Sequence, residues 1–330
     1  MYDTICLEIR ECELDEPVSF MEEVVCKIRV NERKSTNSKI VGNLSNMHIE
    51  IKGPVLKIWG SLSKWHNIHN VYGMEFKDVR KAIERLGKAL GVPLEKAIVR
   101  RIDIAQTFDM KYLAKLYMEK LQYLKGYDRS FFRSTLYFSK ESKRKMDWGN
   151  MQLCFYDKDD ELKKLKKEVE INKYTIHERS VFLLRYELRL KNPRYTLGRE
   201  IRCFDLFFGD FYSELIKLWY DMYNRIEKRL ESLEDYCEMN LNGKKELYET
   251  CLRLCIMAFD MEKEVDIAAK KKKVTAQNKS NVLKKIKDIK DELKSKHPVM
   301  SMIDELNNAI ADEYKKQMED VKNSNGSLAK

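Results

Sequence analysis

The sequence lacks several patterns that would place it in a familiar class. Its eight cysteines include no Cys-x-x-Cys pair, which argues against a zinc site and favours small buried thiols in a reducing compartment. No apolar run approaches the roughly 18 residues of a membrane span, and no charged start followed by an apolar stretch suggests a signal peptide. We therefore expect a cytoplasmic protein with no membrane contact.

The sequence has an excess of positive charge. Of the 330 residues 35% are charged, and the formal net charge is +10. Lysine and arginine that neutralise phosphates release counterions, so this excess favours a polyanionic partner. An acidic membrane surface or simple solubility would explain the same charge, and net charge alone does not choose between them.

The chain is 43% hydrophobic, which is enough for a hydrophobic core. The predicted secondary structure changes near residue 200. The first part mixes strands of period two with amphipathic helices, whereas the remainder shows only helical patterns. This predicts an α+β fold, with an antiparallel central sheet flanked by helices in a domain of residues 1–200. An all-helical module with a basic segment is predicted over 201–330. Strands are predicted at 4–10, 24–30, 47–53, 55–61, 97–108, 134–139, 151–156 and 181–191, and helices at 74–92, within 109–126, at about 159–170, and at 214–239, 244–265 and 268–297.

Three predicted strands set polar groups on their less apolar side. By alternation, Asp103, Tyr156 and Glu187 would share one sheet face if their strands are neighbours. Glu161, in the first turn of the helix after Tyr156, could join them. Carboxylate oxygens without usable histidine or cysteine suit Mg²⁺ or Mn²⁺. A solvated face of charged cross-strand pairs is the other interpretation.

A tyrosine beside such a cation has a definite chemical use. A phenol has a pKa of about 10 and is a poor nucleophile at neutral pH. A divalent cation on a scissile phosphate would neutralise charge and polarise phosphorus for attack. Lys158, two residues after Tyr156, would stabilise the phenolate.

These residues lie in motifs that resemble a known family. The segments "RRIDIAQTF" (100–108), "STLYFSKES" (134–142), "MQLCFYDKDDEL" (151–162) and "LLRYELRLK" (183–191) follow the order and spacing of the filamentous-phage replication initiators. "HNIHNVYG" (66–73) resembles another element of that family. The resemblance covers roughly residues 50–192 and extends to the trans-acting initiators of rolling-circle plasmids. The His-hydrophobic-His metal motif of many rolling-circle nucleases is missing.

The resemblance implies roles for individual residues. Tyr156 matches the family's nucleophilic tyrosine, and Lys158 and Glu161 match the lysine and glutamate that follow it. Asp103 matches the aspartate of the Arg-Ile-Asp strand, and Glu187 the glutamate of the Arg-aromatic-Glu strand. Asp103, Glu161 and Glu187 are therefore the expected ligands of Mg²⁺ or Mn²⁺.

Further residues are expected to contact DNA, and two other tyrosines are alternatives to Tyr156 as the nucleophile. Tyr174 could be a second catalytic tyrosine, whereas Tyr137 is expected to pack in its strand. The lysines at 270–273 could bind DNA or form a merely soluble segment. The expected DNA contacts are Arg101, His69, Asn70, Arg185, Arg189, Lys163 and Lys164.

The function that the resemblance implies is rolling-circle initiation in a bacterial host cell. Tyr156 would nick one strand of a phage or plasmid origin, keep the 5′ phosphate and free a 3′-OH primer, and the displaced strand would later be rejoined. The implied partners are origin DNA, double- and single-stranded, and a host helicase, DNA polymerase and single-strand-binding protein. A conjugative relaxase and a non-catalytic DNA-binding regulator are the alternatives.

Overall fold

The structure is a computed structural model that describes residues 1–16, 18–140, 150–165, 182–228, 243–258, 261–296 and 302–327. It forms two compact units. The first comprises residues 1–227 and 308–330, and the second comprises residues 228–307. The chain thus returns to the first unit at its end. The predicted boundary of a catalytic domain near residue 200 stays a prediction.

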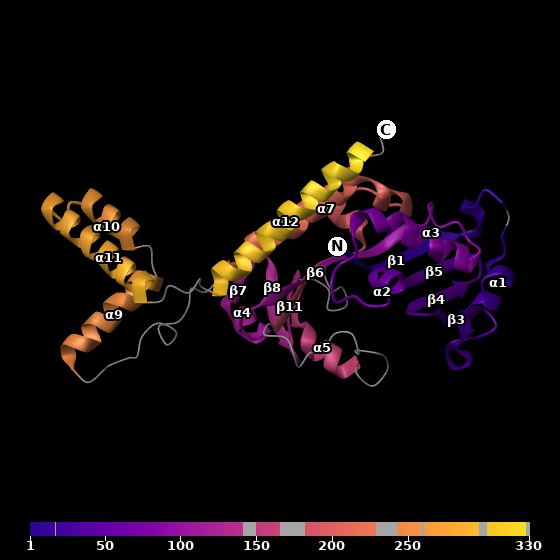
Figure 1. The fold of residues 1–330 in the computed structure, drawn as a ribbon, viewed down its shortest axis with the longest axis horizontal. Coiled ribbons are helices and arrows are strands. Elements are labelled where there is room, and N and C mark those ends of the chain that lie inside the picture. Colours follow the sequence, from indigo (N-terminus) through magenta and orange to yellow (C-terminus); the bar gives the residue numbers. More distant parts are fainter. Residues whose placement is uncertain are drawn as a thin grey trace. The chain divides into compact units, whose positions relative to one another are not determined.

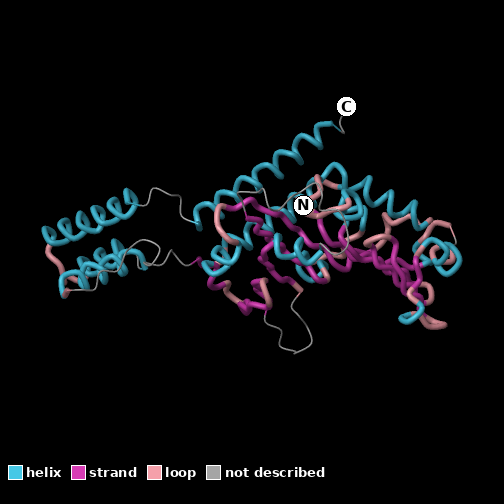
Figure 2. Tube along the Cα trace, turned by 60° about the horizontal axis from the view of Figure 1, so that its bottom comes forward, coloured by secondary structure: helices cyan, strands magenta, loops and turns pink. Residues whose placement is uncertain are grey.

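The first unit is built on a ten-stranded antiparallel sheet in the order β2-β3-β4-β5-β1-β6-β11-β10-β9-β8. Figure 2 shows these strands as one continuous layer flanked by helices. The α+β architecture predicted from the sequence is confirmed. The strands are β1 (Tyr2–Arg10), β2 (Arg29–Val30), β3 (Lys39–Leu44), β4 (Met47–Lys52), β5 (Val55–Ser61), β6 (Ile98–Met110), β8 (Tyr127–Phe132), β9 (Thr135–Lys140), β10 (Met151–Asp157) and β11 (Phe182–Lys191), besides the short β7 (Leu121–Tyr123) and β12 (Glu227–Lys228).

Helices and 3₁₀ turns surround the sheet in the first unit. The predicted amphipathic helix is α3, which ends at Gly91 with φ of 71°, a left-handed conformation that glycine adopts without strain. The α-helices are α1 (Phe20–Glu23), α2 (Leu62–Asn67), α3 (Val79–Leu90), α4 (Ala114–Lys120), α5 (Lys158–Leu165), α6 (Pro193–Leu197), α7 (Gly209–Asn224) and α12 (Met302–Ser327), and the 3₁₀ helices are η1 (Glu11–Glu13), η2 (Val25–Lys27), η3 (Glu32–Lys34), η4 (Phe76–Asp78) and η6 (Cys203–Phe207).

The alternating strands give the sheet one apolar and one polar face. On the apolar face, Tyr186 of β11 stacks on Phe155 of β10 with centroids 4.5 Å apart, and Trp219 of α7 stacks on Tyr186 at 4.9 Å. Helix α12 runs beside α7 (Figure 1). Tyr314 of α12 stacks on Tyr220 of α7 with ring centroids 4.3 Å apart. Burying these rings on one side fixes the register of β10 and β11, because a shift by one residue would reverse the faces of the strand.

Two parts of the sheet differ from the sequence prediction. The stretch 24–30 is predicted to be a strand, but its first residues form η2, which directly follows α1, and only β2 reaches the sheet beside β3. Strands β3 and β8 are absent from the sequence prediction. Each lacks a clean alternation: every residue of β8 after Tyr127 is exposed, so neither periodicity nor hydrophobicity marks it.

The second unit is helical, as predicted. It contains α9 (Lys244–Ala258), α10 (Met261–Lys270), α11 (Ala276–Lys296) and the first six residues of α12, 302–307. Its small core joins Ile256, Val265 and Ile286, one from each of the first three helices, with Leu283 packed against it. The lysines at 271–273 lie exposed in the turn between α10 and α11. Their role in DNA binding stays a prediction.

Candidate active site on the polar face

The polar residues predicted to share a face do so, because their strands are neighbours. Strand β11 pairs with β10 on one side and with β6 on the other. Tyr156 lies opposite Arg185, and Asp103 lies opposite Arg189. Paired residues of antiparallel strands point to the same side of the sheet. The face opposite the aromatic core therefore carries Tyr156, Glu187 and Asp103.

Tyr156 is held by Glu187. The phenol donates a hydrogen bond of 2.7 Å to Oε1 of the carboxylate. Burial raises the pKa of Tyr156 well above its ordinary value, and the negative charge of Glu187 raises it further. The tyrosine is consequently a neutral, oriented phenol in the free protein, and it needs help to become a nucleophile.

Glu187 is itself pinned by two arginines. Arg185 donates from Nε to Oε1 at 2.8 Å, and Arg189 donates to Oε2 from Nε and a terminal nitrogen at 2.9 and 2.7 Å. Burial alone would raise the pKa of Glu187, but the charges of Arg189 and Arg185 outweigh it and hold that pKa well below its ordinary value. With both arginines in place, Glu187 is too weak a base to keep the proton of Tyr156.

Arg185 makes hydrogen bonds to four residues of the polar face. Its side chain is fully buried and joins groups from four parts of the chain. The guanidinium donates to Asp3 Oδ2 at 2.6 Å, to the backbone oxygen of Asn70 at 2.8 Å and to Thr107 Oγ1 at 3.1 Å, in addition to Glu187. A buried charge is tolerated only when its donors find partners, and here they are satisfied.

Asp103 extends the row of alternating charges across β6. Arg101 donates to both of its oxygens, at 2.9 and 2.6 Å, and Arg189 Nε lies 4.0 Å from Oδ2. Burial nevertheless raises the pKa of Asp103 to about 6, against the opposing hydrogen bond and charge of Arg101. Arg189 thus stands between two carboxylates, and its side chain is 22% exposed, so a solvent-borne anion can reach it.

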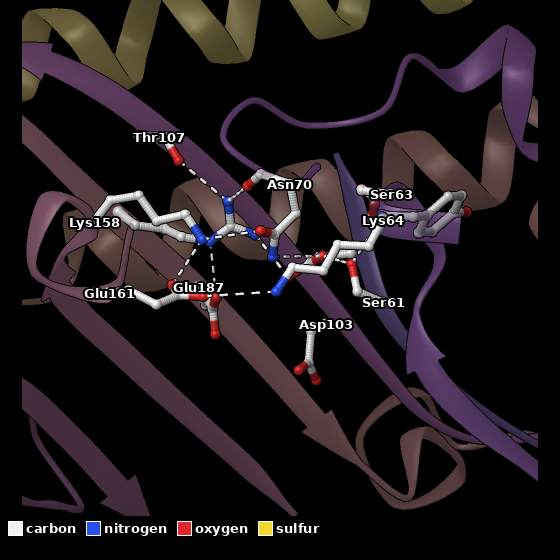
Figure 3. Close-up of polar contacts among 12 residues, drawn as sticks. Ser61, Ser63, Lys64, Asn70, Asp103, Thr107, Lys158, Glu161 and Glu187 are labelled. Atoms are coloured by element: carbon white, nitrogen blue, oxygen red, sulfur yellow. Dashed lines mark hydrogen bonds and ion pairs between the residues drawn. The ribbon is translucent and has the colours of Figure 1, made fainter. Parts of the chain in front are cut away.

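Lys158 approaches the tyrosine from the start of α5. It is fully buried, with Nζ 2.7 Å from Glu161 Oε2, 3.0 Å from Asn70 Oδ1 and 5.9 Å from the ring centroid of Tyr156. Figure 3 shows Lys158, Glu161 and Asn70 around one polar cluster, with Asp103 to one side of it. Burial and the charge of Arg185 lower the pKa of Lys158 to about 8, although Glu161 opposes the shift.

The three carboxylates expected to bind a metal are chemically suited to Mg²⁺ or Mn²⁺. Each of them is ion-paired: Asp103 with Arg101, Glu187 with the two arginines, and Glu161 with Lys158. No group of three acidic, histidine or cysteine side chains close enough to hold an ion occurs among the described residues. The donor types suit such a cation, but the three carboxylates do not lie close enough together to hold one in this structure, and binding would require them to leave their ion pairs and move together.

Sequence reasoning missed Asp3. Strict alternation along β1 would place it with Ile5 on the apolar face, but a register irregularity between Tyr2 and Ile5 turns it to the polar side. There Asp3 is buried and accepts from Arg185 and, at 2.6 Å, from Ser61 Oγ. Only the bulge makes Asp3 part of the site, and no local signal in the sequence predicts a bulge at this position.

The remaining predicted residues lie nearby or outside the described structure. Asn70 is buried within the cluster, and His69 precedes it half-buried. Arg101 is partly exposed beside Asp103. Lys163 and Lys164 belong to α5, but their side chains lie outside the described residues, as does Tyr174. The roles of all these residues in DNA binding or catalysis stay predictions.

The fold and the site together place the protein in a broad class, that of nucleic-acid-binding α+β proteins with a tyrosine in the site. This is an α+β protein whose polar sheet face offers a tyrosine among arginines and carboxylates, and arginines of this kind suit the phosphates of nucleic acid. The chain belongs to the filamentous-phage replication initiators: the family model for the N-terminal part of a phage replication-associated protein matches residues 1–199. Membership implies a replication initiator of the rolling-circle type. None of the curated proteins matches the chain, and no helix among the described residues is long and apolar enough to cross a membrane.

Proposed function

We propose that the protein nicks one strand of its origin DNA by tyrosine transesterification. The Tyr156 oxygen attacks phosphorus, its bond to phosphorus forms as the bond from phosphorus to the 3′ oxygen breaks, and the 5′ phosphate stays on the enzyme. The observation that carries this proposal is the 2.7 Å hydrogen bond from Tyr156 to a buried, doubly ion-paired Glu187. It pairs a candidate nucleophile with a proton acceptor beside arginines that suit a phosphate.

The arginines give the substrate a way to activate the tyrosine. A scissile phosphate that draws Arg189 away from Glu187 would remove the largest charge that lowers the carboxylate's pKa. Glu187 would then become a stronger base and accept the Tyr156 proton through their existing hydrogen bond. The resting phenol would stay inert until DNA arrives, which would limit nicking to bound substrate.

Lys158 would supply the proton that the departing 3′ oxygen needs. Its pKa of about 8 leaves it mostly protonated at neutral pH yet ready to donate. When the strand is rejoined, the same amine would take the proton back from the attacking 3′-OH. The charge would also stabilise phenolate, since the ammonium lies 5.9 Å from the ring centroid.

The role of Lys158 predicts a pH dependence. The acid form is the active one and is lost as pH rises through the folded pKa, so the rate of adduct formation should fall above about pH 8. Lys158→Met should lower the rate at pH 7 by about 10²-fold and lose this alkaline decline. Lys64→Met is the matched control, because Lys64 lies 3.8 Å from the same Glu161 but is partly exposed. A wild-type rate that stays constant from neutral pH to about pH 9 would count against this role.

A divalent cation, when bound, would neutralise the scissile phosphate and polarise it for attack. Asp103 and Glu161 are the residues that would hold it once bound DNA draws them out of their ion pairs. Glu187, the third predicted ligand, is the proton acceptor in this scheme, and a carboxylate that holds a cation would not also take the Tyr156 proton. We expect EDTA to abolish adduct formation and added Mg²⁺ or Mn²⁺ to restore it, with DNA binding largely retained. Glu161→Gln should raise the Mg²⁺ concentration needed for half-maximal rate by about 10-fold or more. Undiminished adduct formation in EDTA would refute the metal's role.

The nick would start rolling-circle synthesis. The 3′-OH would prime a host DNA polymerase, with a host helicase and single-strand-binding protein at the displaced strand. The test is an SDS-resistant adduct between the protein and origin DNA in the presence of Mg²⁺ or Mn²⁺. A regulator that only binds DNA would form no adduct. The family match favours an initiator over a conjugative relaxase with the same chemistry.

A further inference from the structure

The hairpin of β8 and β9 exposes two adjacent aromatic rings at its tip. Phe132 is 64% exposed and Phe131 is 44% exposed, at the end of the sheet's edge strand. Exposed apolar side chains on an edge strand favour unwanted association, and proteins generally avoid them there. An aromatic pair at this position therefore suggests a partner.

The strand register places one of the two rings in the row of the candidate nucleophile. Phe132 pairs with Thr135 of β9, Thr135 pairs with Tyr156 of β10, and Tyr156 pairs with Arg185 of β11. All four side chains therefore point to the polar face. With about 4.8 Å between strands, Phe132 stands about 10 Å from Tyr156 along this row. Phe131 pairs with Leu136 and points to the opposite face.

An arginine, Arg133, lies beside the ring of Phe132. The guanidinium of Arg133 lies 5.3 Å above the centroid of Phe132. Arg133 has φ of 54° in the two-residue turn of the hairpin, a left-handed conformation in which glycine or asparagine is the usual choice. A long cationic side chain at a strained turn position, beside an exposed ring, indicates that the side chain itself is used.

The second phenylalanine provides an internal contrast. Arg129 lies 4.9 Å from the centroid of Phe131, but its Nε donates to the backbone oxygen of Leu121 at 2.7 Å. That pair is tied to the protein on the face of the sheet that carries the core. Only the Phe132 side combines high exposure, a cation and the row of Tyr156.

The geometry points to Phe132 and Arg133 as a stacking platform for a base of single-stranded DNA next to the scissile phosphate. This inference rests on the proposed function for the identity of the phosphate. An exposed phenylalanine stacks on the face of any base, and the adjacent guanidinium attracts the backbone. Single-stranded DNA, rather than duplex, is the ligand because its bases are free to stack. The platform would hold the strand in register with Tyr156 without reading its sequence.

The test measures binding separately from cleavage. A fluorescein-labelled oligo(dT) of about 20 nucleotides is titrated by anisotropy in EDTA, with every substitution made in Tyr156→Phe protein. We expect Phe132→Ala to raise Kd by about 5- to 150-fold and Phe132→Trp to restore binding. Phe131→Ala is the matched control and should change Kd by less than about threefold. A 2-aminopurine beside the scissile position should lose fluorescence on binding, and Phe132→Ala should prevent that loss.

The outcomes separate this inference from the nicking proposal. If Phe132→Ala binds oligo(dT) as tightly as its parent, the platform is refuted, even where wild-type protein forms the covalent adduct. If Phe132→Ala changes the sedimentation of the free protein and leaves DNA affinity unchanged, the rings serve self-association and the platform is equally refuted. Weakened binding in a protein that never forms an adduct would support Phe132 as a base-stacking site for single-stranded DNA, and it would refute the nicking proposal and with it the place of the platform beside a scissile phosphate.

Discussion

Tyr156→Phe should abolish the covalent protein–DNA adduct and reduce nicking by at least about 10³-fold. Phenylalanine keeps the ring but lacks the oxygen that would form the bond to phosphorus. The substitution also removes the hydrogen bond to Glu187, whose carboxylate retains its two arginines, so we expect the fold to survive. The measurement is an SDS-resistant band on labelled single-stranded origin DNA with Mg²⁺ or Mn²⁺, compared with wild type.

Two other tyrosines provide controls for this experiment. Tyr137 lies on β9 opposite Cys154, on the same face and two residue pairs along from the row of Tyr156. Tyr137→Phe should therefore form the adduct at close to the wild-type rate if position in the site matters. Tyr174 is the other candidate that the sequence offers. An adduct that survives in Tyr156→Phe and disappears in Tyr174→Phe would transfer the nucleophilic role to Tyr174.

The central strands could be predicted from the sequence, but the contacts within the site could not. Strands β6, β10 and β11 alternate apolar and polar residues, so alternation reports both their existence and the side to which Asp103, Tyr156 and Glu187 point. Which arginine meets which carboxylate depends on register between strands far apart in the chain, as when Tyr156 pairs with Arg185. Periodicity within one strand carries no such information.

The elements that were missed share a physical reason. Strand β8 is solvent-exposed along most of its length, so its residues face no selection for an apolar side. Asp3 enters the site through a register irregularity in β1, which breaks the period of two on which the prediction depends. Edge strands and bulges are where functional groups often depart from regular patterning. Asp3 and β8 lie near the row of Tyr156, whereas β3, the other missed strand, lies toward the opposite edge of the sheet.

Arg185→Met should lower the free energy of unfolding by about 3–5 kcal/mol at neutral pH. Methionine fills a similar volume but leaves Asp3 and Glu187 as buried carboxylates with one cation fewer, and it leaves the backbone oxygen of Asn70 without its donor. Chemical unfolding followed by circular dichroism provides the measurement. Arg189→Met is the matched control, because Arg189 is 22% exposed and Glu187 keeps Arg185; it should cost less than Arg185→Met, because only one buried carboxylate loses a direct hydrogen-bonded cation.

The pH dependence of Arg185→Met tests whether charge rather than packing causes its loss of stability. The pKa of Glu187 is depressed in the folded wild type. Its stabilisation is therefore fully present above the unfolded value of about 4.3 and is lost progressively as pH falls below that value toward the lower folded pKa. Removing Arg185 weakens the depression, so the gap between wild type and variant should narrow toward acid pH. Adding Asp3→Asn and Glu187→Gln to Arg185→Met should likewise recover much of the loss at neutral pH. A gap that stays constant with pH and is not recovered would assign the effect to packing, and the charge network would then have no role in stability.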